Sequence, residues 1–223
     1  CMTKIYEEEW DLEDVALSFD DKYLAVKINR DGYSVMEIYN THTQSFENAP
    51  SMPKGVMAYY GISWAPSSHR LLVTLSSGKR PSDIWMLDLG HEKVERMTFT
   101  DLQGIDSDDL VEPILCHYQS FDGLTVPYWL YTGKGDAGKG SVAVEIHGGP
   151  EAQERPMFSP MIQYLVNEGL TVVAPNVRGS TGYGKNYHHL DDVEKRLDSV
   201  HDAACLAEHL VKEGLAEKDR IAV

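Results

Sequence analysis

The chain has 223 residues, of which 42% are hydrophobic and 25% are charged, a composition typical of a globular protein with one large domain or parts of two. Its net charge of −15 argues against nucleic acid and anionic membranes as partners, because both are polyanions. Three widely spaced cysteines exclude a disulfide framework and favour a reduced, cytoplasmic location. No apolar run approaches the roughly 20 residues that a membrane span requires.

The first hundred residues predict short strands that alternate with turns. The expected strands cover residues 15–19, 23–28, 33–39, 70–75 and 83–89. Phe19 and Trp64 take the same place in two similar segments, which gives a repeat of 45 residues. A repeat of roughly 40–50 residues with several short strands is typical of β-propeller blades, although an antiparallel sandwich would produce a similar pattern. We therefore expect residues 1–105 to be the terminal blades of an incomplete propeller.

A polar, acidic connector at residues 101–113 marks a domain boundary. The pattern then changes to strands separated by helices, which predicts a doubly wound, mostly parallel sheet over residues 112–223. The expected strands cover residues 113–120, 124–131, 141–146, 170–174 and 220–223, and the expected helices cover 159–168 and 197–213.

Two candidate ligand sites lack features that such sites require. The glycine-rich segment 133–140 lacks the Ser or Thr that a phosphate-binding loop needs after its lysine, and it precedes a strand instead of a helix. The nine histidines offer no convincing set of zinc ligands. We therefore expect no cofactor and no metal.

The segment His147-Gly148-Gly149-Pro150 follows the apolar strand predicted at 141–146. A buried strand that leads into His-Gly-Gly is how many α/β-hydrolases build half of an oxyanion hole, since glycine lets main-chain N–H groups approach the developing negative charge. A turn that happens to contain two glycines is the alternative interpretation.

A second glycine-rich loop follows the strand at 170–174 and contains Arg178, Gly179 and Tyr183. We expect these residues beside an active site. Arg178 is the single arginine among small residues, and it could pair with an acidic group such as Asp202 on the next helix. A structural ion pair is favoured over substrate binding for this arginine.

Four motifs in this order resemble the prolyl oligopeptidase family of serine peptidases, in particular its acylaminoacyl-peptidase-like branch. They are SFDG at 120–123, HGGP at 147–150, PNVRGSTGYG at 175–184 and KDRIAV at 218–223. The resemblance implies an α/β-hydrolase capped by a β-propeller, hydrolysis of short peptides by a Ser-Asp-His triad, and the Gly149 N–H as one oxyanion donor.

The sequence departs from this family in one respect: it contains no G-x-S-x-G turn, and neither Ser180 nor Ser199 has the context of a nucleophile. We therefore expect the chain to be an internal fragment that carries the first half of the hydrolase and is inactive without the triad.

Two other functions stay open. One is a carboxylesterase of the α/β-hydrolase fold, and the other is a non-catalytic interaction module that binds through its propeller. For a peptidase, we expect a short peptide substrate as the partner and neither nucleic acid nor a membrane. An open sheet edge allows a homo-oligomer.

Overall fold

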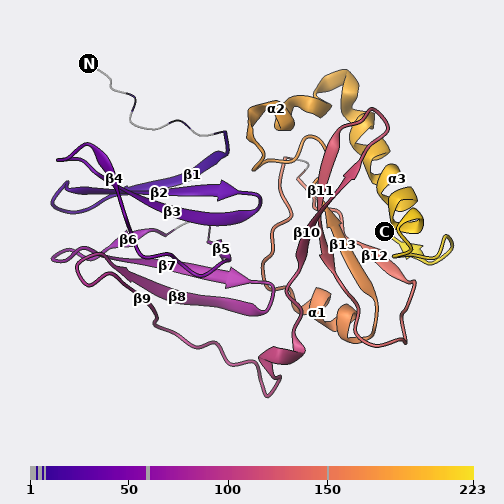
Figure 1. Cartoon of the computed structure of the whole chain (residues 1–223), viewed down its shortest axis with the longest axis horizontal. Helices are drawn as coiled ribbons and strands as arrows, with labels where there is room; N and C mark the ends of the chain where they lie inside the picture. Colours follow the sequence, from indigo (N-terminus) through magenta and orange to yellow (C-terminus); the bar gives the residue numbers. More distant parts are fainter. Residues whose placement is uncertain (1–3, 5–6, 8, 59–60, 150) are drawn as a thin grey trace.

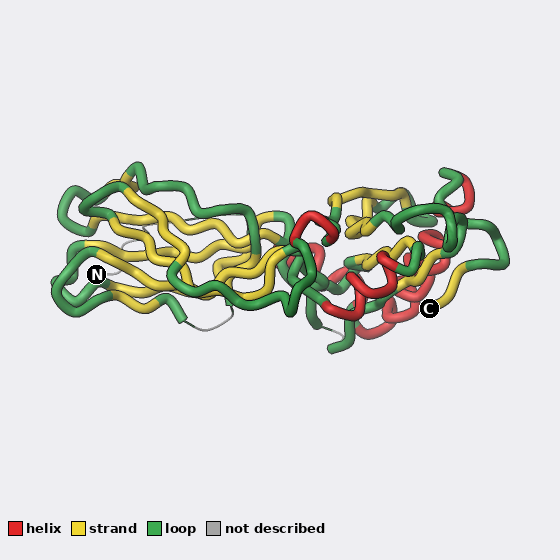
Figure 2. Tube along the Cα trace, turned by 90° about the horizontal axis from the view of Figure 1, so that it is seen from below, coloured by secondary structure: helices red, strands yellow, loops and turns green. Residues whose placement is uncertain are grey.

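The structure is a computed structural model, and it describes residues 4, 7, 9–58, 61–149 and 151–223. Three β-sheets form the framework, and α-helices occur only in the C-terminal half of the described chain (Figure 1, Figure 2). None of the helices in these ranges is long and apolar enough to cross a membrane.

The first two sheets are antiparallel, and their strands follow one another through short turns. The first has the order β1 (Asp11–Leu17), β2 (Tyr23–Arg30), β3 (Tyr33–Asn40) and β4 (Ser45–Glu47). The second contains β5 (Val56–Met57), β6 (Ser63–Trp64), β7 (Arg70–Ser77), β8 (Arg80–Asp88) and β9 (Lys93–Arg96). Asp31 and Gly32 both have positive φ, which suits the tight turn between β2 and β3.

These two sheets share one hydrophobic core. Ala25 and Ile38 of the first sheet belong to the same buried cluster as Trp64, Leu71 and Leu87 of the second. Burial of such side chains contributes roughly 1.5–3 kcal/mol each. The shared core fixes the two sheets as stacked layers (Figure 1).

The repeat in this region is 47 residues long, so the predicted value of 45 is wrong. Leu17 pairs with Leu24, and 47 positions later Trp64 pairs with Leu71 in the same way. Trp64 therefore corresponds to Leu17, whereas Phe19 lies in the following turn and is 68% exposed. The turns set the register of the strands, so the two aromatic residues do not occupy equivalent positions although they are chemically similar.

The turn expected between the strands predicted at 70–75 and 83–89 is also shorter than expected. β7 continues through Ser77 and β8 begins at Arg80, so only two residues separate the strands. Ser76 is buried, and its hydroxyl donates to the Arg80 carbonyl oxygen. The polar residues that suggested a longer turn lie within the strand and are hydrogen-bonded there.

The third sheet has the strand order β10-β11-β13-β12-β14. Its strands are β10 (Ile114–Gln119), β11 (Thr125–Tyr131), β12 (Val142–Val144), β13 (Thr171–Pro175) and β14 (Ile221–Ala222). β12 pairs in parallel with β13 and β14, whereas β11 is antiparallel to both β10 and β13. The described sheet is thus mixed instead of mostly parallel, because the β10–β11 hairpin brings its second strand in antiparallel to β13.

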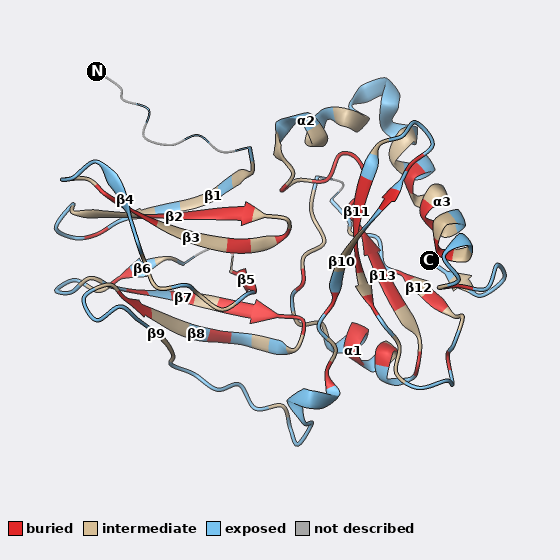
Figure 3. Ribbon diagram, in the orientation of Figure 1, coloured by how far each residue is buried: buried red, intermediate tan, exposed pale blue. Residues whose placement is uncertain are grey.

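Two helices cover opposite faces of this sheet. They are α1 (Pro160–Asn167) and α3 (Arg196–Lys212). The described chain also contains α2 (Gly184–His188) and 3-10 turns at Ser107–Asp109, His189–Asp191 and Val193–Lys195. Tyr128 of β11 packs in a cluster with Leu206 of α3, and the next residue, Trp129, packs with Ile162 of α1. Adjacent strand residues point to opposite faces, so the sheet is buried on both sides (Figure 3).

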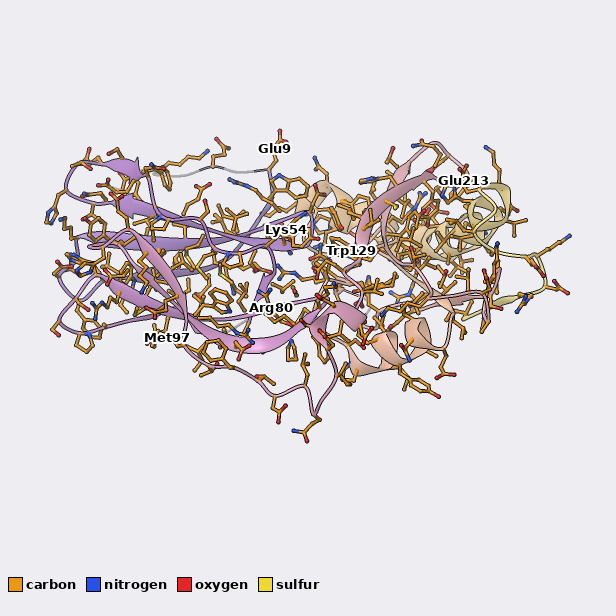
Figure 4. All side chains as sticks on the ribbon, turned by 60° about the horizontal axis from the view of Figure 1, so that its bottom comes forward. Glu9, Lys54, Arg80, Met97, Trp129 and Glu213 are labelled. Atoms are coloured by element: carbon orange, nitrogen blue, oxygen red, sulfur yellow. The ribbon has the colours of Figure 1, made fainter. Side chains whose placement is uncertain are left out.

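Trp129 joins the third sheet to the first. Its ring meets Tyr33 edge-on, with centroids 5.2 Å apart, and its Nε1 donates to the carbonyl oxygen of Glu154 at 3.1 Å. Figure 4 shows this side chain where the N-terminal strands approach the C-terminal half. The side chain is fully buried and therefore holds the halves together through apolar contact and one hydrogen bond.

Candidate active site

The His-Gly-Gly segment lies in the loop after β12. β12 ends at Val144, two residues earlier than the predicted strand, although the Glu145 N–H still donates to the carbonyl oxygen of Val173. Gly148 and Gly149 are exposed, while Pro150 lies outside the described residues. The parallel pairing of β12 with β14 places the carboxyl ends of both strands at the same edge of the sheet. Open α/β sheets bind ligands at this edge.

The amides of Gly148 and Gly149 have no acceptor among the described residues. Gly149 has a φ of +137°, a value that favours glycine, and a Cβ there would lie 3.0 Å from Cβ of Ala152. At Gly148 an added Cβ would meet nothing within 4 Å. Exposed main-chain donors at the end of a buried strand are suited to bind an anionic oxygen.

The side chain of His147 points toward the neighbouring loop, which follows β13. Its Nε2 lies 2.9 Å from Ser180 Oγ, and the Ser180 hydroxyl donates to the carbonyl oxygen of Val177 at 2.6 Å. The ring of His147 is therefore hydrogen-bonded to a hydroxyl group that the neighbouring loop holds in place. Burial lowers the pKa of His147, although the nearby Gly148 carbonyl oxygen opposes this effect, so the neutral ring is favoured at neutral pH.

Arg178 forms the ion pair with Asp202 that the sequence suggested. Its Nε and Nη2 donate to the Asp202 carboxylate at 2.9 and 2.8 Å, and its main-chain N–H donates to the same group. Ser120 also donates to this carboxylate, which is fully buried. The hydrogen bonds to Asp202 raise the pKa of Arg178 despite partial burial.

The outer side of the same guanidinium binds Asp122. Both Nη atoms of Arg178 donate to this carboxylate, at 2.8 and 2.9 Å, and they lower the pKa of Asp122 to about 2. The Asp122 side chain is 42% exposed, in contrast to Asp202. Arg178 is thus committed to two carboxylates of the scaffold and has a structural role in this loop.

Gly179 and Tyr183 also lie within this packed loop. Gly179 has a φ of +90°, and a Cβ there would overlap the Asp191 carboxylate, so both the conformation and the space require glycine. The Tyr183 hydroxyl accepts from Asn176 Nδ2 at 3.1 Å, and its ring lies beside Trp10. Tyr183 therefore connects the loop to the N-terminal segment.

Arg155 is a partly buried residue near the site that no sequence pattern indicated. Its guanidinium pairs with Glu13 of β1 at 2.5 Å and also donates to the Gly32 carbonyl oxygen and to Ser34 Oγ. Burial lowers the pKa of Arg155, and the Glu13 charge opposes that shift. No local pattern could reveal this residue, because all three partners lie more than 120 positions away.

A cavity of about 890 Å³ opens where the first sheet meets the two loops. Trp10 and Glu13 line it from the N-terminal side, and Gln153, Arg155 and Gly182 line it from the loops. The cavity therefore lies next to the segment that carries the glycine pair. In the described ranges no group of three or more His, Cys, Asp or Glu side chains is placed to hold a metal ion.

Glu154 is a partly buried residue with a carboxyl group in the same loop. Burial, with a further contribution from the Glu145 charge, raises its pKa from 4.5 to about 7. The folded state therefore favours the protonated form, and the charged form opposes folding as the pH rises toward and above 7.

Glu154→Gln is expected to stabilise the protein at pH 8 by up to about 3 kcal/mol, because it removes a charge that folding keeps from water. The gain should disappear below about pH 4.5, where the carboxyl group is protonated in both the folded and unfolded states. Urea unfolding at pH 8 and pH 4 measures this difference. Glu145→Gln, which removes only the neighbouring charge, should give a smaller gain at pH 8. Equal stability of wild type and Glu154→Gln at pH 8 would contradict the argument.

The chain is similar to known peptidases. Residues 156–223 match the prolyl oligopeptidase family. Dipeptidyl peptidase family member 6 of Caenorhabditis elegans is 28% identical over 174 residues, which are 68% of this chain and 23% of that protein. Dipeptidyl aminopeptidase BIII of Pseudoxanthomonas mexicana is 36% identical over 94 residues, 41% of this chain and 13% of that protein. The chain thus spans less than a quarter of either relative. The predicted resemblance to the prolyl oligopeptidase family is confirmed.

The fold agrees with this relationship. A crystal structure of puromycin hydrolase superposes on 98% of this chain with a TM-score of 0.85 and 19% sequence identity. The superposed part is 34% of that chain. The three sheets therefore share the fold of the corresponding third of that structure.

Proposed function

Since residues 156–223 match the model of the prolyl oligopeptidase family, we propose that the protein containing this chain is a serine-type peptidase. Its reaction is hydrolysis of short peptides through an acyl-enzyme. The observation that carries the proposal is the pair of exposed glycine amides, Gly148 and Gly149, at the carboxyl end of a parallel strand. No cofactor is required for this chemistry.

The proposal divides the chain into two parts. Residues 1–105 are terminal blades of a β-propeller, and residues 112–223 are the N-terminal half of an α/β-hydrolase domain. The 47-residue correspondence between β1–β2 and β6–β7 supports the first assignment. The order β10-β11-β13-β12-β14, with helices on both faces, supports the second.

Within this scheme the Gly149 N–H stabilises the oxyanion of the tetrahedral intermediate. A single donor of this kind contributes roughly 3–4 kcal/mol to lowering the barrier. The 223 residues contain no G-x-S-x-G sequence, so the nucleophile and its partners belong to other parts of the protein. The chain by itself is therefore proposed to be inactive.

The cavity between the first sheet and the two loops is the proposed site for the peptide. It adjoins the glycine pair through Gln153 and Arg155 of the same loop. The free cysteines at 116 and 205 support a cytoplasmic location, and the exposed sheet edges leave a homo-oligomer open.

The full-length protein tests the proposal with three reagents. We expect covalent labelling of one serine by a fluorophosphonate, and turnover of a dipeptide anilide as well as of a p-nitrophenyl ester. Turnover of the ester without the anilide would indicate a carboxylesterase. Neither turnover nor labelling would indicate an interaction module. The 223-residue chain, tested alongside, should not react.

A further inference from the structure

The loop that carries the glycine pair has no helix or strand among its described residues between β12 and α1. Catalysis by main-chain donors requires that these donors already point at the oxyanion, since any reorganisation during the reaction would cost activation energy. An exposed glycine pair is the part of a chain with the most conformational freedom. Some other part of the structure must therefore fix this loop.

The neighbouring loop, which follows β13, binds the glycine-bearing segment on both sides of Gly148 and Gly149. On the N-terminal side, His147 Nε2 is hydrogen-bonded to Ser180 Oγ at 2.9 Å. On the C-terminal side, Asn176 makes two hydrogen bonds to the main chain of Glu154: its Oδ1 accepts from the N–H at 2.7 Å and its Nδ2 donates to the carbonyl oxygen at 2.9 Å.

A third contact lies between these two. The Thr181 N–H donates to the Ala152 carbonyl oxygen at 2.9 Å. The side chain of Asn176 is fully buried, and Ser180 is 1% exposed. Buried hydrogen bonds of this kind have no water to replace them, so their geometry is strongly specified.

The supporting loop is itself rigid. It starts on the central strand β13, and Arg178 fixes its middle to Asp202 on α3. The Gly179 N–H donates to the carbonyl oxygen of Tyr187, and Ser180 donates to Val177 through both its amide and its hydroxyl group. This loop is therefore a preformed template against which a flexible segment can be held.

We propose that Asn176 and Ser180 are positioning residues that hold the Gly148–Gly149 amides in the orientation needed for acyl transfer. The inference rests on the proposed function. Neither side chain lines the cavity proposed for the peptide: Ser180 acts through the His147 ring, and Asn176 acts through the main chain of Glu154. Loss of their hydrogen bonds should weaken stabilisation of the transition state more than binding of the peptide, because the peptide could still enter the cavity if the loop were displaced.

The test compares Asn176→Ala and Ser180→Ala in the full-length protein with a peptide anilide as substrate. A shift of about 1 Å in a catalytic group can cost roughly 100-fold in rate, so we expect kcat to fall 10- to 100-fold. KM should change less than about threefold. Phosphonylation by a fluorophosphonate should slow in parallel with kcat, since it uses the same oxyanion donors.

Ser199→Ala is the matched control, because its hydroxyl donates only to the Arg196 carbonyl oxygen within its own helix. This variant should keep wild-type kcat. Ser180→Thr retains a hydroxyl group and should recover part of the activity lost in Ser180→Ala. Thermal unfolding of each variant distinguishes a loss of folding from a displacement of the glycine-bearing loop. Because Asn176 and Ser180 are substituted separately, one variant still tests the inference if the other fails to fold.

The outcomes distinguish this inference from the proposed function. An active wild type whose folded Asn176 and Ser180 variants keep their kcat would overturn the positioning role alone. Equal losses in kcat and in substrate affinity would overturn it as well. A wild type that neither turns over the anilide nor reacts with the fluorophosphonate would overturn the proposed function, and the inference with it.

Discussion

Asp202→Ala is expected to lower the free energy of unfolding by about 3–5 kcal/mol, the cost of removing one partner of a buried ion pair. The Asp202 carboxylate is fully buried and accepts hydrogen bonds from Arg178 and Ser120. Without it, the inner edge of the Arg178 guanidinium has no acceptor. Urea unfolding should show a lower midpoint with an unchanged m value.

Asp122→Asn provides the matched control, because Asp122 binds the same guanidinium from its exposed side. An exposed ion pair typically contributes about 0–1 kcal/mol, so this variant should lose no more than that. If the two variants lost the same stability, the distinction between the buried and exposed halves of the network would be wrong.

Gly149→Ala is expected to reduce kcat of the full-length protein by roughly 100- to 1,000-fold, the loss that follows removal of one oxyanion donor. The φ of +137° is strained for alanine, and the new methyl group would press against Ala152, so the amide must turn. Steady-state kinetics with a peptide anilide measures the loss, and KM should change much less than kcat.

Gly148→Ala separates this effect from a general change in the loop. Its φ does not lie in the left-handed region, and an added methyl group meets no atom within 4 Å. We expect a loss in kcat of less than about tenfold, since the backbone can stay where it is. Losses of equal size in both variants would show that Gly149 has no special role.

Much of the fold could be predicted from the chain alone, because local patterns determine it. The alternation in β2 and β3, with Asp31 and Gly32 between them, specified a hairpin. Ser159 and Gly169 marked the limits of α1, and the Ser159 hydroxyl does cap its first turn. The antiparallel pairing of β11 with β13 was missed, since it joins residues more than 40 positions apart.

The candidate site was predictable only in part. The His-Gly-Gly segment could be recognised because one strand and two glycines are adjacent in sequence. The Arg178–Asp202 pair could be suggested, since Arg178 is the single arginine among small residues and Asp202 is an acidic residue on the next helix. Asn176 and Ser180 could not, because their partners lie on another loop and small polar residues in a glycine-rich segment suggest only a turn.

The most direct test of the account is a crystal structure of the full-length protein after reaction with a fluorophosphonate. The phosphoryl oxygen then stands where the oxyanion of the acyl-transfer intermediate would lie. The account predicts that this oxygen lies about 2.7–3.1 Å from the Gly149 nitrogen, with His147 still bound to Ser180. An oxygen held by other donors, with the Gly149 amide turned away from it, would contradict the central claim.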